Sequence, residues 1–286
     1  GTYTDSDEPV AVSNLMGITA IAGGRYHSIA LGNDSTVWAW GFNGEGAFGN
    51  GTYNDSNLPV HINSLTGIIA ISAGTNFTLA LKADGTVWAW GINDEGQLGN
   101  DTYVNSNVPV PVSFLTGITA ISAGYFHALA LKNDGSVWAW GFGGNGQLGI
   151  GNLYDSSVPV VVSSITGANA VAGGRFHSMA LINDGTVLSW GNNGSGQLGD
   201  GTNINHTTPV QVMILTNVSS IAAGGVHSLA RKNDGTAWAW GSNDDGELGI
   251  GTNINSRLPL LVDELCHVLS INQMLNHNSV CVFPNP

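Results

Sequence analysis

The sequence predicts an all-β protein, a six-bladed β-propeller of 50-residue, four-stranded repeats whose sixth blade is incomplete. Three observations predict this class. A unit of 50 residues recurs without insertion or deletion, each unit holds four short apolar runs between turn residues, and Gly is frequent (41 of 286 residues) while charged residues are scarce (9%). Runs of about five residues suit strands, and regular repetition of four strands is typical of propellers.

The repeat is clearest in a Trp-containing segment. Val37–Gly41 reads Val-Trp-Ala-Trp-Gly, the same residues return at 87–91 and 137–141, and looser copies follow at 187–191 and 237–241. Side chains alternate between the two faces of a strand, and here both sets are apolar. We therefore expect each sheet to lie between two others in a ring. The Trp residues expected to have this structural role are Trp40, Trp90, Trp140, Trp190 and Trp240.

The other strands follow from the spacing of the apolar runs. In the third unit the runs cover 108–112, 118–121, 127–131 and 136–140. Between the last two lies Asn133–Gly135, whose Asp-Gly pair supplies the positive φ of a tight hairpin turn. The first unit has Asp-Ser at this place, which makes a weaker turn. Four antiparallel strands per blade are the expected result.

A single propeller domain is predicted over residues 1–283, and residues 284–286 would begin a linker or a sorting tail. The sixth unit keeps the phase of the repeat through 266–283 but ends before its Trp-containing strand. Residues 1–16 open at the next phase of the repeat and contain the apolar run Pro9–Val12. We predict that this N-terminal strand pairs with the C-terminal hairpin and closes the ring.

Two segments of the unit resemble the regulator of chromosome condensation repeat family. Gly124–Leu131 reads Gly-Tyr-Phe-His-Ala-Leu-Ala-Leu, and Gly146–Gly149 reads Gly-Gln-Leu-Gly. The resemblance covers residues 1 to about 283 and implies a propeller with an interaction surface. Its best-studied eukaryotic members are nucleotide exchange factors for a small GTPase and bind chromatin. This chain has fewer units and an acidic balance, and secreted bacterial members, among them a protein inhibitor of β-lactamases, fit its composition better.

The last residues concern localisation. Val282–Pro286 resembles the opening of the C-terminal sorting tails of type IX secretion, although an ordinary Pro-rich terminus has the same composition. The resemblance implies a bacterial protein that is secreted or held at the cell surface.

Charge and motifs exclude several functions. The formal charge is −13, which repels nucleic acid and anionic lipid surfaces. No apolar run approaches the roughly 18 residues of a spanning helix, so no membrane insertion is expected. No nucleophile elbow occurs, and the neighbouring acids Asp94–Glu95 and Asp244–Asp245 fall in solvated turns. We expect no enzymatic activity, no cofactor and no metal.

Histidine recurs at one phase of the unit, with Phe77 in its place in the second unit. One imidazole per blade spreads around an axis, whereas a zinc site gathers its ligands about one ion. We therefore predict a structural role, in which each ring bonds backbone near the adjacent Gly. The residues are His27, His127, His177, His227 and His277.

The two cysteines, Cys266 and Cys281, both lie in the last unit. A hairpin there places them nearly opposite one another. A disulfide would enclose 14 residues, add about 3 kcal/mol of stability and indicate an oxidising compartment. Two reduced thiols are the alternative.

The loops between units differ most in sequence, and loops on a rigid scaffold carry recognition. Their mixture of Tyr with Asn, Asp and Ser is typical of adaptable binding surfaces and equally of solvated linkers. The candidate binding residues are Tyr3, Asp5, Tyr53, Asp55, Tyr103, Asn105, Tyr154, Asp155, Asn203 and Asn205.

These observations favour an extracellular or cell-surface binding scaffold that recognises a protein partner, or a copy of itself, through its loops. A glycan-binding adhesin is one alternative. A filament subunit that assembles through the incomplete blade is another, because unpaired strand edges accept further strands. A hydrolase is the least favoured.

Overall fold

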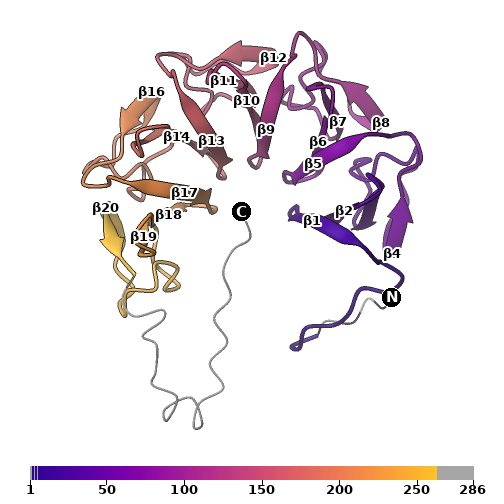
Figure 1. The fold of residues 1–286 in the computed structure, drawn as a ribbon, viewed down its shortest axis with the longest axis horizontal. Coiled ribbons are helices and arrows are strands. Elements are labelled where there is room, and N and C mark those ends of the chain that lie inside the picture. The colour runs from indigo at the N-terminus through magenta and orange to yellow at the C-terminus, as the bar shows by residue number, and fades with distance from the viewer. Residues whose placement is uncertain (1, 3, 5, 263–286) are drawn as a thin grey trace.

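The computed structural model describes residues 2, 4 and 6–262. Their regular secondary structure consists of 20 β-strands in five four-stranded antiparallel sheets, arranged around an axis (Figure 1). This part of the chain has no helix long and apolar enough to cross a membrane. The predicted all-β class and the predicted four strands per sheet are confirmed.

All five sheets share one order, in which strands adjacent in sequence are adjacent in the sheet. The first sheet comprises β1 (Ile18–Gly23), β2 (His27–Gly32), β3 (Val37–Gly41) and β4 (Ser56–His61). The second comprises β5 (Ile68–Ala73), β6 (Phe77–Lys82), β7 (Val87–Gly91) and β8 (Ser106–Pro111). The third comprises β9 (Ile118–Ala123), β10 (His127–Lys132), β11 (Val137–Gly141) and β12 (Ser156–Val161). The fourth comprises β13 (Ala168–Gly173), β14 (His177–Ile182), β15 (Val187–Gly191) and β16 (His206–Gln211). The fifth comprises β17 (Val218–Ala223), β18 (His227–Lys232), β19 (Ala237–Gly241) and β20 (Ser256–Leu261).

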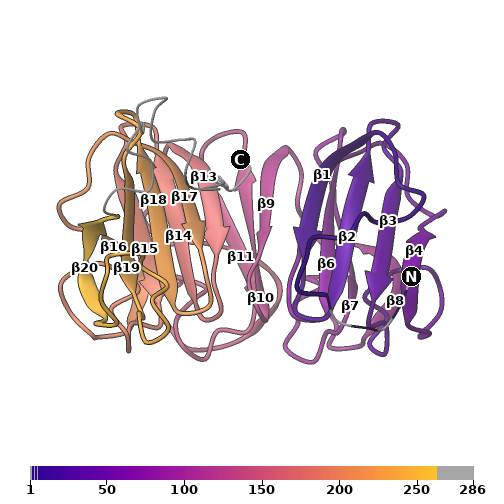
Figure 2. The same cartoon turned by 90° about the horizontal axis from the view of Figure 1, so that it is seen from below.

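The first strand of each sheet lies nearest the axis and the fourth lies at the perimeter (Figure 1). The inner strands contact one another in sequence order, β1 with β5, β5 with β9, β9 with β13 and β13 with β17. Figure 2 shows the strands running between the two ends of the ring. Each turn and loop therefore belongs to one end or the other.

The boundary between sheets differs from the sequence prediction in one respect. The run at 108–112, which opens the third unit, pairs with β7 and completes the second sheet, because Ala89 lies opposite Val110 and Gly91 opposite Ser106. The long loop 92–105 turns the chain back along the same sheet, and only the short connection 112–117 passes to the next. Each sheet thus takes its fourth strand from the following sequence unit.

The N-terminal closing strand does not appear in the structure. Residues 9–12 form no strand and are exposed. A strand needs a hydrogen-bonded partner, and the hairpin predicted as that partner falls within 263–286, outside the described residues. The partial sixth blade at 266–283, together with Cys266, His277 and Cys281, falls there too, so closure of the ring stays a prediction.

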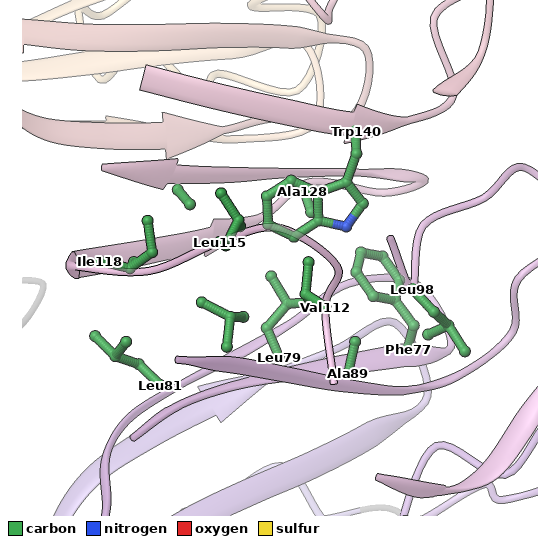
Figure 3. Packing of buried hydrophobic residues seen from close by; sticks show 12 residues of the cluster. Phe77, Leu79, Leu81, Ala89, Leu98, Val112, Leu115, Ile118, Ala128 and Trp140 are labelled. Carbon is green, nitrogen blue, oxygen red and sulfur yellow. The ribbon is translucent and has the colours of Figure 1, made fainter. Parts of the chain in front are cut away.

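Packing between sheets forms the core, and Figure 3 shows the layer between the second and third sheets. Trp140 on β11 is 0% exposed and packs with Phe77, Leu79, Leu98 and Ala128. Its indole N–H donates to the carbonyl of Gln97, in the long loop of the preceding sheet, at 2.9 Å. Equivalent bonds run from Trp90, Trp190 and Trp240 to the loops before them. Trp40 is only half-buried, because its sheet is the first of the series and has no described sheet before it.

One hairpin shows a local defect that substitution should remove. Ser35 adopts φ 66° where the other sheets place glycine, for example Gly85 at φ 79°. A side chain in this left-handed region costs about 1–2 kcal/mol relative to glycine. We expect Ser35→Gly to raise the free energy of unfolding by about 0.5–1 kcal/mol, since the added freedom of glycine in the unfolded chain offsets part of the gain. Urea denaturation measures the change, and an unchanged or lower midpoint would contradict it.

Candidate interaction face

The strand order divides the loops between two ends of the ring. Within the first sheet, His27 pairs with Gly41 and Gly41 with Ser56, so the turn 24–26 and the loop 42–55 leave from the same end. This end, with its four counterparts, is called the long-loop face. The hairpin turn 33–35 and the connection 62–67 lie at the opposite end, the hairpin face.

A cavity of about 330 Å³ lies on the axis, among the turns between the first and second strands of all five sheets. The turns are joined by backbone hydrogen bonds from sheet to sheet. Arg25 N donates to Thr75 O at 3.2 Å, Thr75 N to Tyr125 O at 3.1 Å, and Arg175 N to Gly225 O at 3.2 Å. These bonds hold the cavity wall as one rigid unit.

Two arginines line this cavity, and both lie against aromatic rings. The Arg25 guanidinium lies 4.9 Å from the centroid of the Tyr26 ring. The Arg175 guanidinium lies 5.4 Å from the centroid of Tyr125 and 5.1 Å from that of Phe176. Among the residues that the structure describes, neither guanidinium forms an ion pair with a carboxylate. Stacking on an aromatic face orients a guanidinium while leaving its N–H groups free.

More aromatic side chains extend these arginines into a patch. Tyr26 and Phe42 meet edge to face with centroids 6.2 Å apart, and Phe176 lies 6.3 Å from Phe126 and 6.0 Å from Phe142. Aromatic residues and arginine dominate the energetics of protein interfaces. We call this surface the axial patch; it comprises Arg25, Tyr26, Phe42, Tyr125, Phe126, Phe142, Arg175 and Phe176.

The outer rim of the same face is also apolar. Of the predicted loop residues, Tyr53, Tyr103 and Tyr154 are exposed, the last of them to 77%. Four aliphatic side chains in the same loops are exposed as well: Val104, Leu153, Ile204 and Ile254. Large apolar side chains gathered on one surface mark interaction sites.

Other predicted loop residues are used inside the loops. Near the start of each of the first four loops, a backbone N–H donates to a side-chain oxygen 12 residues later, over 2.7–2.8 Å. The acceptors are Asp55, Asn105, Asp155 and Asn205. The side chain of Asn203 likewise donates to Gly194 O at 3.0 Å. These groups shape the loops, and the exposed tyrosines are left to meet a partner. Tyr3 and Asp5 lie outside the described residues.

The acceptor residues also meet the neighbouring sheet. Asn105 Nδ2 donates to Glu45 at 3.0 Å, but in the next sheet the equivalent pair is Glu95 and Asp155, two acids. Partial burial, and then the negative charge of Asp155, raise the pKa of Glu95.

The described residues contain no group of three or more His, Cys, Asp or Glu side chains that could hold a metal ion.

Asp155→Asn is therefore expected to stabilise the protein at pH 7 by about 0.2–1 kcal/mol, because like-charge repulsion is replaced by the bond seen at Asn105. The gain disappears at low pH, where a protonated Glu95 can donate to Asp155. Asn105→Asp is the matched control and should destabilise by a similar amount at pH 7. Thermal unfolding at pH 7 and pH 4 measures both, and a gain in stability that is the same at the two pH values would contradict the account.

The recurring histidines bond side chains of the next sheet, and not backbone near the adjacent Gly as predicted. His127 Nε2 lies 2.9 Å from Ser178 Oγ, which itself donates to Gln147 O at 2.8 Å. The hydroxyl proton is thus committed, so Nε2 carries the hydrogen and donates. His27 with Thr78 and His177 with Ser228 repeat the arrangement. His227 keeps the same place in the last described sheet.

The imidazole also explains the glycine before it. A Cβ on Gly124 would lie 2.2 Å from Cε1 of His127 and 2.6 Å from Gly174 O. The close approach of ring and neighbouring backbone requires glycine here. Where Phe77 replaces histidine, the position that otherwise carries the hydroxyl is Ala128, so both sides of that contact are apolar.

The axial patch was not predicted from the sequence. One signal was present, because a variable position stands between the fixed Gly and His of each unit, occupied by Arg25, Thr75, Tyr125, Arg175 and Gly225. Variation between fixed positions marks a place whose side chain the fold does not dictate. Only the ring geometry brings these five places together around one axis.

Repeated four-stranded sheets around an axis, with long loops gathered at one end, define a β-propeller scaffold. The model of the RCC1-like domain matches residues 1–280, and the chain belongs to that family. The resemblance stated from the sequence is thereby confirmed. A comparison with curated protein sequences finds no match.

Solved structures share the fold. Human WBSCR16 is 23% identical, with a TM-score of 0.80 over 91% of this chain and 71% of that one. Yeast RCC1 (Prp20), solved bound to Kap60, is 22% identical, with a TM-score of 0.65 over 86% of this chain and 75% of that one. Prp20p from Saccharomyces cerevisiae, described with its binding properties to Gsp1p and histones, gives 21% and 0.64 over 86% and 77%.

Proposed function

We propose that this protein is a protein-binding scaffold whose recognition surface is the long-loop face. The observation that carries the proposal is the axial patch, in which two exposed arginines of the first and fourth sheets lie against aromatic rings that are exposed or half-buried. Arg and Tyr anchors at the centre of a surface, with an apolar rim around them, match the composition of interface hot spots. The rigid strands beneath keep these anchors in place, which lowers the entropic cost of binding.

Proteins with this fold give indirect support. Yeast Prp20 is described in complex with Kap60 and with binding properties to Gsp1p and histones, so one relative of this scaffold binds proteins. The acidic balance of the present chain, at −13, favours a partner other than nucleic acid.

A capture experiment tests the proposal. The wild-type protein and the variant Tyr26→Ala/Phe176→Ala are immobilised and exposed to an extract of the organism that makes them. The control Phe114→Ala/Ile214→Ala removes two exposed apolar side chains from the hairpin face. A partner retained by the wild type and the control but lost by the axial variant, and then shown to bind as a purified protein, supports the proposal. Equal retention by all three would contradict the proposal. Binding of purified glycans would instead support the adhesin, and binding of a second copy of the chain would support the filament subunit.

We also propose an extracellular setting, supported by the acidic composition and by the two cysteines. An oxidising compartment predicts a disulfide between Cys266 and Cys281. Peptide mapping of the native protein without reduction should recover the two cysteines in one linked peptide pair. Alkylation of both as free thiols in protein taken directly from its source would contradict this setting.

A further inference from the structure

We propose that the axial cavity is a carboxylate site, which receives an acidic side chain of a protein partner between Arg25 and Arg175. The inference deepens the proposed function and rests on it. Neither the repeat pattern nor the family resemblance predicts a charged residue at the positions of Arg25 and Arg175.

The first observation behind the carboxylate site is the distribution of charge around the axis. The chain has 7 Lys and Arg against 20 Asp and Glu, yet two of the seven cations line one cavity that, within residues 6–262, no acidic residue lines. By contrast, Lys132 and Lys232 on the hairpin face lie 3.7 Å and 3.6 Å from the carboxylates of Asp134 and Asp234. Like Lys82, Arg231 and Arg257, the two axial arginines form no ion pair among the described residues. They differ from those three in that both line one cavity.

A buried hydroxyl gives the second, independent observation. Thr75 lines the same cavity, is 4% exposed, and its Oγ1 has no hydrogen-bond partner in the described residues. A buried polar group without a partner is costly unless a ligand or water completes it. A carboxylate accepts hydrogen bonds only, so it suits a site whose accessible side-chain donors are two guanidinium groups, while the Thr75 hydroxyl lies shielded within the cavity wall.

Size and access fit one acidic side chain. A volume of about 330 Å³ lies at the low end of ligand sites and leaves little room for a large molecule. Gly23 and Gly225 line the cavity without a side chain, and a Cβ at either place would meet no described atom within 4 Å. The hydrogen bonds between turns fix the backbone that carries the two arginines, and the aromatic rings beside each guanidinium limit its rearrangement on binding.

The surroundings favour a protein segment over a free small acid. Tyr26 and Phe42, exposed to 52% and 37%, continue outward from Arg25, and Phe176 continues outward from Arg175. A peptide with one acidic residue between apolar residues would place its carboxylate in the cavity and its apolar side chains on these rings. A small anion would leave the rings unused.

The test uses arrays of short peptides. Each peptide of the first array has one central Asp or Glu between apolar residues, and the second array has Asn or Gln in the same place. The strongest peptide is then labelled, and its affinity is measured by fluorescence anisotropy. Arg25→Gln/Arg175→Gln is compared with Lys82→Gln/Lys132→Gln, which removes the same charge from the hairpin face. A third variant, Gly225→Glu, places a carboxylate of the chain itself among the residues that line the cavity.

We expect binding of acidic peptides that weakens at least about tenfold in the axial double variant and in Gly225→Glu, and changes less than about twofold in the lysine control. Equal binding to the acidic and amide arrays, or equal loss in the two double variants, would overturn the inference. Binding of citrate or inorganic phosphate without any acidic peptide would also overturn it, because the ligand would then be a free anion. If a captured partner depends on Tyr26 and Phe176 but not on the arginines, the proposed function stands and the carboxylate site fails.

Discussion

Replacing Trp140 by alanine is expected to lower the free energy of unfolding by about 3–5 kcal/mol. The indole is fully buried between the second and third sheets, and its N–H is bonded to Gln97 O at 2.9 Å. Deletion leaves a cavity against Phe77 and Leu98 and frees a buried carbonyl. Neighbouring sheets cannot collapse into the space, because the strands on either side are fixed by their own ladders.

Trp138→Ala is the matched control, since the residue lies on the same strand as Trp140 but is half-buried. A loss of about 1–2 kcal/mol is expected there, in proportion to the smaller buried area. Urea denaturation followed by far-ultraviolet circular dichroism avoids the change in fluorescence. Equal losses in the two variants would show that burial between sheets does not distinguish these tryptophans.

Acidification from pH 7 to pH 5 is expected to destabilise the protein through its buried histidines. Burial lowers the pKa of His27 from 6.5 to about 4, and burial together with a neighbouring histidine lowers the pKa of His127 and of His177 to about 3. The folded-state pKa lies below that of the unfolded chain, so the unfolded state takes up protons first as the pH falls through 6.5. Each histidine thus contributes stability above pH 6.5 that is lost towards pH 4, on the order of 1–2 kcal/mol by pH 5.

The chain supplies its own control for this effect. Phe77 and Ala128, both buried in one apolar cluster, show that an apolar pair fits the place of a His and a hydroxyl. His127→Phe/Ser178→Ala should therefore keep the fold at pH 7 and remove about a third of the loss in stability between pH 7 and pH 5. Denaturation midpoints across this range measure the slope. An unchanged slope in the double variant would contradict the assignment, because carboxylates titrate mainly below this window.

The sequence predicted the strands but not every contact between them. Short apolar runs and the Asp-Gly hairpins mark each strand, and two apolar faces on the Trp strand predict a sheet covered on both sides. The sequence analysis assigned the fourth strand to the wrong sheet, because that assignment depends on how the loop 92–105 turns back. A hydrogen bond from the backbone N–H of Asn93 to the side-chain oxygen of Asn105 holds this loop. The pattern of apolar residues within one strand does not indicate with which sheet that strand pairs.

The candidate site was predicted in part for a similar reason. Loop composition identifies Tyr53, Tyr103 and Tyr154 as exposed residues of the long-loop face. The axial patch combines residues from separate units, such as Arg25 and Arg175, which stand 150 positions apart in the sequence. The histidine partners were missed on the same ground, since each lies 51 positions away on the next sheet. Contacts of this kind form only when the sheets are arranged around the axis, so no single sequence unit reveals them.

Site-specific photo-crosslinking tests the role of the long-loop face most directly. p-Benzoylphenylalanine is placed at position 26 or position 176 of the axial patch, and at position 114, where the native Phe114 is 83% exposed on the hairpin face. Irradiation in native extract should attach the same partner protein at 26 and 176 and not at 114. Attachment at 114 alone, or equally at all three positions, would contradict a recognition surface at the long-loop end of the ring.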